Sequence, residues 1–191
     1  MAPGARRPRL DAAAVVEAAA EIADAHGLDA VTLSSVAAKL GVKPPSLYSH
    51  VDGLPDLRRR LSSLGASELA EVLTPAVAGR AAGDALRAAG HAYRRWALAH
   101  PGRHAAAEFV LVPEDPGARR AVELLVSVMS GYGLQGDEAI HAVRAVRASL
   151  LGFVALESRG GFGIPLAVDE SFEWLLDLLD QGLARSGGGA A

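Results

Sequence analysis

The amino-acid sequence predicts an all-α protein of about nine helices. Apolar residues recur three and four positions apart in one segment after another, which is the spacing of one helix face. Glycine, proline and aspartate separate these segments, and no segment shows the alternation of apolar and polar residues that is typical of a strand. Three short helices precede six longer ones, so we expect a small N-terminal domain and a larger C-terminal domain.

Each of the first two helices has recognisable ends. Asp11 is a suitable N-cap, apolar residues follow it at helical spacing, and Gly27 ends the first helix. Thr32 or Ser34 can cap a second helix of about two turns, which ends at Gly41.

A third short helix is expected to begin at the double proline. Pro44 and Pro45 suit a first helical turn, because their fixed φ matches the helix and the missing N–H has no partner there. This helix should run to about His50, before a break at Asp52-Gly53.

Glycine, proline and aspartate residues also mark the ends of the expected helices in the rest of the chain. Further helices are expected near residues 54–78, 83–99, 103–111, 117–132, 137–159 and 169–185. The expected parts are a basic flexible arm (1–10), a domain of three short helices (11–57), a larger helical domain (58–185) and a flexible tail (186–191).

Composition narrows the class of protein. Half of the 191 residues are apolar, and the absence of cysteine excludes disulfides, thiol catalysis and cysteine-rich zinc sites. No apolar stretch approaches the roughly 18 to 20 residues that a membrane span needs, and we see no signal peptide. We therefore expect a soluble cytoplasmic protein without a membrane partner. The net charge is −3, but the first ten residues are basic.

A short helix, a turn at Gly41 and a second short helix follow in the order of a helix-turn-helix. The second helix of this motif enters the major groove, so it needs an apolar back and a polar front. Leu47 and Val51 supply the back; the alternative is a short surface helix that contacts no DNA. The candidate DNA-contacting residues are Arg6, Arg7, Arg9, Thr32, Ser34, Lys43, Pro44, Pro45, Ser46, Tyr48, Ser49 and His50.

Residues 11–57 resemble the DNA-binding domain of the tetracycline-repressor-like (TetR) family of bacterial transcriptional regulators. The family usually has an aromatic residue after the histidine and a phosphate-contacting lysine at the start of the next helix, where this chain has Val51 and Gly53-Leu54-Pro55. The matching positions are Thr32, Leu33, Val36, Ala37, Leu40, Gly41, Val42, Leu47 and Tyr48.

The segments "RAVRASLLGFVALESRGGFGIP" and "DESFEWLLDLL" are similar to a C-terminal ligand-binding and dimerisation domain in one branch of this family. That branch carries an aliphatic-His-Gly-aromatic run and a Gly-Gly-Phe loop, and Leu151 stands at the histidine position here. The matching positions are Gly152, Phe153, Leu156, Glu157, Gly160, Gly161 and Phe162.

The last two expected helices have a wide apolar arc, which favours association of two subunits through a four-helix interface. The alternative is that both helices only complete the core of one chain. The candidate interface residues are Val146, Leu150, Phe153, Phe172, Leu175, Leu176 and Leu179.

The middle of the chain is expected to hold an effector pocket, made of large apolar side chains and a few polar groups. Ordinary core packing is the alternative for each aromatic residue. Arg144 and Arg147 share a helix face and could bind an acidic ligand, but we expect them to pair with Glu108 or Glu157. The candidate ligand-contacting residues are His91, Trp96, His100, Phe109, Met129, Tyr132 and Arg147.

An enzyme is not expected, because the chain has no zinc-protease motif, phosphate loop, nucleophile elbow or dinucleotide fingerprint. His100 and His104 lie four apart, but Pro101-Gly102 between them disfavours one continuous helix, so we expect no metal and no cofactor.

The sequence predicts a homodimeric repressor that leaves a palindromic operator when it binds a small hydrophobic or aromatic effector. The alternative is an all-α small-molecule binding protein without specific DNA recognition.

Overall fold

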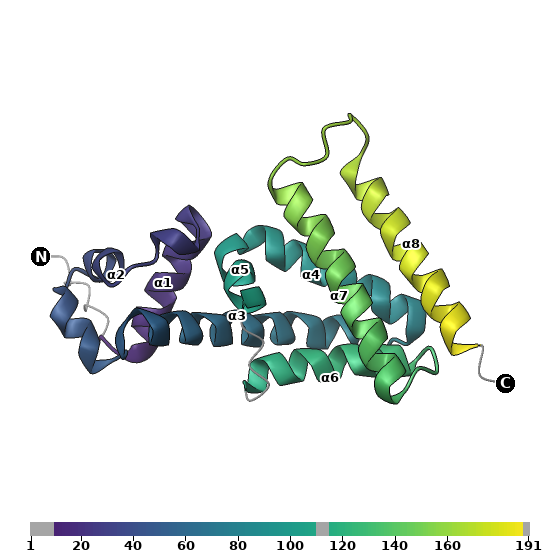
Figure 1. Cartoon of the computed structure of the whole chain (residues 1–191), viewed down its shortest axis with the longest axis horizontal. Helices are drawn as coiled ribbons and strands as arrows, with labels where there is room; N and C mark the ends of the chain where they lie inside the picture. The colour runs from purple at the N-terminus through teal and green to yellow at the C-terminus, as the bar shows by residue number, and fades with distance from the viewer. Residues whose placement is uncertain (1–9, 110–114, 189–191) are drawn as a thin grey trace, which may run out of the picture. The chain divides into compact units, whose positions relative to one another are not determined.

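The structure is a computed structural model that describes residues 10–109 and 115–188, with the side chains of residues 108 and 109 excepted. Every regular element in these ranges is a helix, which confirms the predicted all-α class (Figure 1). All nine predicted helices are present, and a short 3-10 turn is added after the first. The elements are α1 (Ala12–His26), η1 (Leu28–Ala30), α2 (Leu33–Leu40), η2 (Pro44–Ser49), α3 (Gly53–Val77), α4 (Ala82–Ala99), α5 (Pro101–Phe109), α6 (Pro116–Ser130), α7 (Gly136–Ser158) and α8 (Val168–Gly187).

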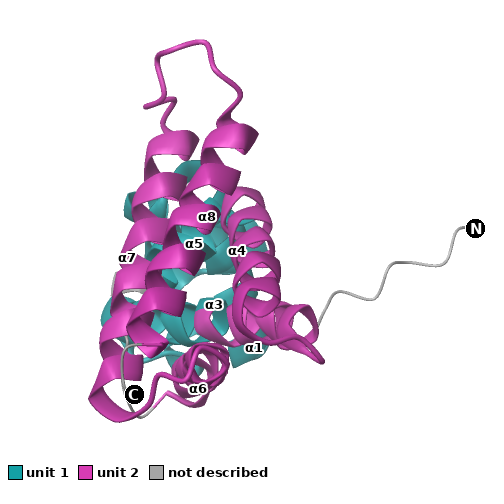
Figure 2. Cartoon of the chain, turned by 90° about the vertical axis from the view of Figure 1, so that its right-hand side faces the viewer, with its two compact units in different colours: residues 1–65, 100–111 teal, residues 66–99, 112–191 magenta. Residues whose placement is uncertain are grey.

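The chain forms two compact units, and neither is continuous in sequence (Figure 2). Unit 1 comprises residues 1–65 and 100–111, and unit 2 comprises residues 66–99 and 112–191. The long helix α3 contributes its first half to unit 1 and its second half to unit 2. These units do not test the predicted functional division of the chain after residue 57, which stays a prediction.

Unit 1 packs α1, α2, η2, the start of α3 and α5 around one apolar core. Val15, Val36, Leu47, Leu57 and Leu61 are all fully buried in this core. Burying each of these side chains contributes about 1.5–3 kcal/mol, so the core fixes the short helices that are too short to be stable alone.

Unit 2 is a helical layer in which α4 packs against α6, α7 and α8. The helices α7 and α8 lie side by side and are joined by a loop over residues 159–167 (Figures 1 and 2). Leu86, Met129, Val146, Phe172 and Leu176 are almost fully buried between these helices.

Two elements differ from the sequence-based expectation. The third short helix is a 3-10 helix over Pro44–Ser49, in which the Ser46 N–H donates to the Lys43 carbonyl and the His50 N–H donates to the Leu47 carbonyl, each three residues back. The last helix continues through Gly187, so the expected tail begins later than residue 186. Residues 1–9 and 189–191, which hold the expected arm and the end of the tail, lie outside the described ranges.

Candidate DNA-binding and effector sites

The first half of the helix-turn-helix is held by local hydrogen bonds. Thr32 caps α2: its side chain accepts a hydrogen bond from the Ser35 N–H at 3.0 Å, and the Ser35 hydroxyl accepts one from the Thr32 N–H at 3.0 Å. The turn at Gly41 has φ of +67°, a left-handed conformation that glycine adopts without strain. The Val42 N–H then donates to the Ala37 carbonyl at 3.0 Å and closes the turn.

The second half, η2, presents two different faces. Leu47 and Val51 are buried in the core of unit 1, as their spacing predicts. Tyr48 is 61% exposed although it is a large aromatic residue. Its neighbours Ser46 and Ser49 are also exposed, so this face offers hydroxyl groups and one aromatic ring to a ligand outside the unit.

The other predicted DNA-contacting residues have different surroundings. Lys43, Pro44, Pro45 and Ser34 are exposed, whereas His50 is half-buried at the end of η2. The Thr32 hydroxyl caps α2, so in this structure its hydrogen bond is made within the chain. Arg6, Arg7 and Arg9 lie outside the described residues.

A carboxylate that the sequence analysis did not select lies in the first turn of α3. Asp56 is only 3% exposed and accepts a hydrogen bond from the Asp52 N–H at 3.0 Å. It also forms ion pairs with Arg59 and with Arg60. The Asp52 N–H, followed by the Arg60 guanidinium, lowers the pKa of Asp56 below the ordinary value of 3.8. The spacing of an acid three and four residues before two arginines was the signal for this cluster.

In unit 2, basic residues of α4 face acidic residues of α8. Arg87 pairs with Asp177, and His91 Nε2 lies 2.9 Å from an oxygen of Glu173. One turn further along α4, Arg94 lies between α7 and α8.

Arg94 is the most buried member of this basic row. Its guanidinium binds Glu157 through two hydrogen bonds, of which the Nε bond is 2.7 Å, and it binds Asp169 at 2.7 Å. The hydrogen bonds to Glu157, and then that to Asp169, raise the pKa of Arg94, so the group stays charged at every physiological pH. The expected pairing of Arg147 with Glu157 is wrong, because Arg94 occupies that carboxylate, and the Glu108 side chain lies outside the description.

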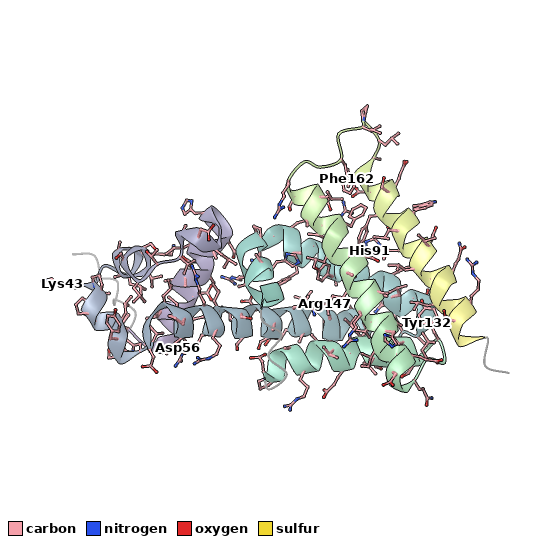
Figure 3. All side chains as sticks on the ribbon, viewed as in Figure 1. Lys43, Asp56, His91, Tyr132, Arg147 and Phe162 are labelled. Atoms are coloured by element: carbon pink, nitrogen blue, oxygen red, sulfur yellow. The ribbon has the colours of Figure 1, made fainter. Side chains whose placement is uncertain are left out.

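An aromatic cluster surrounds the Arg94 guanidinium. The guanidinium carbon lies 4.8 Å from the ring centre of Phe172 and 5.8 Å from that of Phe153. Phe162, from the loop between α7 and α8, packs on Phe153 with ring centres 4.8 Å apart. His91 adds an edge contact to Phe172 at 5.6 Å. Figure 3 shows His91 and Phe162 near the end of α7 and α8 at which this loop lies.

The predicted ligand-contacting residues do not form one cluster. Trp96 and Met129 are buried in the core of unit 2. Tyr132 donates a hydrogen bond to Asp180 at 2.6 Å, near the other end of α8 from His91 (Figure 3). Burial, followed by this hydrogen bond, raises the pKa of Tyr132.

The other three predicted ligand residues are scattered. Arg147 is half-buried on α7. His100 belongs to unit 1, where its Nδ1 lies 3.6 Å from a carboxylate oxygen of Asp24. The Phe109 side chain lies outside the description. Sequence position alone could not separate these residues, because their partners come from helices distant in sequence.

The expected dimer surface requires a correction. Val146, Leu150, Phe172 and Leu176 are buried inside unit 2, so they offer no surface to a second chain. Periodicity identified one apolar face of each helix, but it did not show that the face is covered by the chain itself. The other predicted contacts are half-buried against the same core: Phe153, Leu175 and Leu179.

Other apolar residues of α7 and α8 are exposed. Trp174 is 68% exposed, Leu178 is 50% exposed, and Leu156 at the end of α7 is similar. Trp174 and Leu178 both belong to the wide apolar arc that the sequence predicts for this helix. An exposed tryptophan and leucine four positions apart lie on one face of α8.

Two further features of the described residues concern metal binding and membrane insertion. Within residues 10–109 and 115–188, no group of three or more His, Asp or Glu side chains is arranged to hold a metal ion. One described helix, α7, is long and apolar enough to cross a membrane, a test that core helices of soluble proteins also pass.

The fold and the exposed face of η2 define a helix-turn-helix DNA-binding protein with a second, all-helical unit. The chain matches the family of bacterial regulatory proteins called tetR over residues 15–50. It also matches the tetracyclin repressor-like C-terminal domain over residues 86–179. The chain belongs to the TetR family of transcriptional regulators.

Three relatives illustrate the range of similarity. The uncharacterized HTH-type transcriptional regulator Rv0681 of Mycobacterium tuberculosis is 39% identical over 82% of this chain and 74% of its own length. ActR of Streptomyces coelicolor matches in structure with a TM-score of 0.78 and 24% identity over 100% of both chains; ActR is also known in complex with (S)-DNPA. BioQ of Mycobacterium smegmatis, solved with its double-stranded DNA operator, matches with a TM-score of 0.72 and 25% identity over 92% of this chain and 99% of that chain.

Proposed function

We propose that this transcriptional regulator is a homodimeric repressor whose η2 helix contacts the major groove of a near-palindromic operator. The observation that carries the proposal is the η2 surface: Leu47 anchors the helix in the core, while Ser46, Tyr48 and Ser49 are exposed beside Lys43. Hydroxyl groups and an aromatic ring suit contacts with base edges and thymine methyl groups, and a lysine suits a phosphate. The BioQ complex with operator DNA supports this role for the fold.

The effector is proposed to be a small hydrophobic or aromatic molecule that binds in unit 2. The half-buried rings of Phe153 and Phe162 offer ring faces, the buried Phe172 packs behind Phe153, and His91 and Arg94 adjoin the cluster with polar groups. The complex of ActR with (S)-DNPA supports a small-molecule site in this fold. A ligand that favours the conformation with lower DNA affinity weakens operator binding by the same coupling free energy.

The dimer is proposed to form through the outer surfaces of α7 and α8, where Leu156, Trp174 and Leu178 are exposed. The cytoplasm is the compartment in which a bacterial regulator of this family meets its DNA. An all-α small-molecule binding protein is the alternative, and the exposed polar face of η2 favours the regulator.

DNA capture tests the proposal directly. Purified protein is mixed with fragments of its own genome, and the retained fragments are sequenced. We expect a small set of sites that share an inverted repeat, and Tyr48→Ala should weaken binding to these sites by about 1–3 kcal/mol while random DNA is bound as before. Lys43→Ala should weaken binding to all sequences alike. Retention of random fragments only, with no shared repeat, would contradict specific recognition.

The effector is tested on the captured operator. Compounds with aromatic rings are screened for release of the operator from the protein. A Trp174→Phe variant keeps Trp96, in the core of unit 2, as the sole tryptophan, so its emission reports a change in that core. Release of DNA with an unchanged Trp96 spectrum would place the effector away from this core.

A further inference from the structure

Three consecutive arginines on α3 belong to unit 1, and the proposed function assigns them no contact with DNA or effector. Arg58, Arg59 and Arg60 are all exposed on the second turn of α3. From residue 41 to residue 65 the chain carries four basic residues, these three and Lys43, against the two acids Asp52 and Asp56. This part of unit 1 is therefore positively charged, and it includes η2.

Asp56 fixes the direction of two of the arginine side chains. Its Oδ2 accepts from the Arg60 Nε at 2.9 Å and from the Asp52 N–H at 3.0 Å, so the Arg60 guanidinium lies against the turn that joins η2 to α3. Its Oδ1 accepts from Arg59. Both guanidinium groups are thus drawn toward the N-terminal end of α3, which is the end next to η2. Figure 3 shows Asp56 at this end of α3.

The single carboxylate of Asp56 cannot neutralise the positive charge of both Arg59 and Arg60. The side chains of Arg59 and Arg60 are 63% and 42% exposed, and each guanidinium has five N–H donors of which Asp56 takes one. Arg58 has no ion pair within the part of the chain that the structure describes. Exposed guanidinium donors with excess positive charge match the oxygens of a phosphate.

We infer that Arg58, Arg59 and Arg60 form a phosphate-binding site for the DNA backbone beside η2, and that Asp56 is the positioning residue of this site. The inference rests on the proposed function, because the phosphates are those of DNA bound at η2. The contacts are sequence-independent: they fix the position of η2 on the duplex and add to affinity, whereas the face of η2 supplies the specificity.

Salt dependence of DNA binding tests the inference. Wild-type protein and the variants Arg58→Ala, Arg59→Ala and Arg60→Ala are titrated with a random-sequence duplex of about 30 base pairs and with the captured operator. Each phosphate contact that is lost should reduce the slope of log K against log salt by about one. The triple variant should bind both duplexes about 10–100-fold more weakly near 0.15 M salt, with the same ranking of operator sequences.

A matched control removes equal charge elsewhere. Arg119 and Arg120 are adjacent and exposed on α6, in unit 2. We expect the Arg119→Ala, Arg120→Ala double variant to keep the wild-type slope, and the Arg59→Ala, Arg60→Ala variant to lose about two units of slope. The conservative Arg59→Lys, Arg60→Lys variant keeps the charge and should restore most of the slope. Circular-dichroism melting of every variant identifies any loss of folding.

The outcomes separate this inference from the proposed function. Wild-type protein that binds neither duplex at low salt would overturn the proposed function together with the site. Wild-type protein that binds DNA with a slope the arginine variants preserve would overturn the site alone. An equal loss of slope in the α6 control would show that net charge, and not a local contact, causes the effect, and would overturn the site as well.

Discussion

Asp56 shows how one side chain can join two elements. It holds the backbone of the turn after η2 and also two arginines of α3. Because its pKa in the folded chain is lower than the ordinary value of 3.8, the ionised form stabilises the fold. This stabilisation is complete above about pH 4 and is lost as the pH falls through the lower pKa of the folded chain.

Replacing Asp56 by asparagine should therefore destabilise the protein in a pH-dependent way. At pH 7 we expect the free energy of unfolding to fall by about 1–3 kcal/mol, because hydrogen bonds to a charged acceptor are lost from a buried site. Urea unfolding at pH 7 and below pH 4 measures the difference, which should shrink at the lower pH. Asp52→Asn is the control, since Asp52 is exposed on the same turn. A deficit of equal size at both pH values would show that the charge is not the cause.

Some residue-scale features were predictable and others were not. The burial of Leu47 and Val51 followed from their spacing, because the two residues are only four positions apart in the chain. The pair of Arg94 with Glu157 joins residues 63 positions apart, and local pattern contains no information on such a contact. The aromatic cluster around Phe153, which is the proposed effector site, was missed for the same reason.

Helix α5 is the element whose place the sequence did not reveal. It follows α4 directly, yet it packs on α1 in unit 1. Asp24 of α1 accepts hydrogen bonds from the N–H groups of Gly102 and Arg103, each at 2.9 Å, and so satisfies the first turn of α5. Helix existence and ends were predictable from caps and prolines, but the packing partner depends on contacts between distant segments.

Gly102 is the point of closest approach between α1 and α5. A Cβ atom at this position would lie 2.0 Å from the backbone carbon of Ala23, so one helix must move. Gly102→Ala should lower the free energy of unfolding by at least about 1–3 kcal/mol, as overpacking does against rigid backbone. Thermal unfolding of purified protein measures this loss.

Gly182 provides the control for the helix effect of the same substitution. A Cβ atom there meets no described atom within 4 Å apart from the neighbouring backbone of its own helix. Gly182→Ala in the interior of α8 should raise stability by about 0.5–1 kcal/mol, because alanine loses less backbone entropy than glycine. Equal stability of the Gly102→Ala variant and wild type would show that α1 and α5 are not in close contact.

At the scale of the whole molecule, the all-α class followed from periodicity, whereas the outer surface of the C-terminal helices did not. An amphipathic helix has an apolar face, and the pattern does not say whether the same chain or a second chain covers it. In this protein the face with Phe172 and Leu176 is covered by the chain itself. The apolar residues left over, Trp174 and Leu178, are the ones that a partner subunit is proposed to cover.

The last prediction joins the dimer to its operator. Wild-type protein should have about twice the mass of one 19.7 kDa chain in light scattering. The Trp174→Glu, Leu178→Glu variant should be a folded monomer, because two charges on the contact face oppose its burial. Leu98→Glu, at an exposed apolar position on α4, is the control and should stay dimeric.

Since two η2 helices related by a two-fold axis contact one DNA face only at separations near one helical turn, about 34–36 Å, the monomer should lose high operator affinity. Inserting half a turn of DNA between the half-sites should weaken the wild type in the same way, and undiminished binding by the monomer or to the lengthened operator would contradict the symmetric complex.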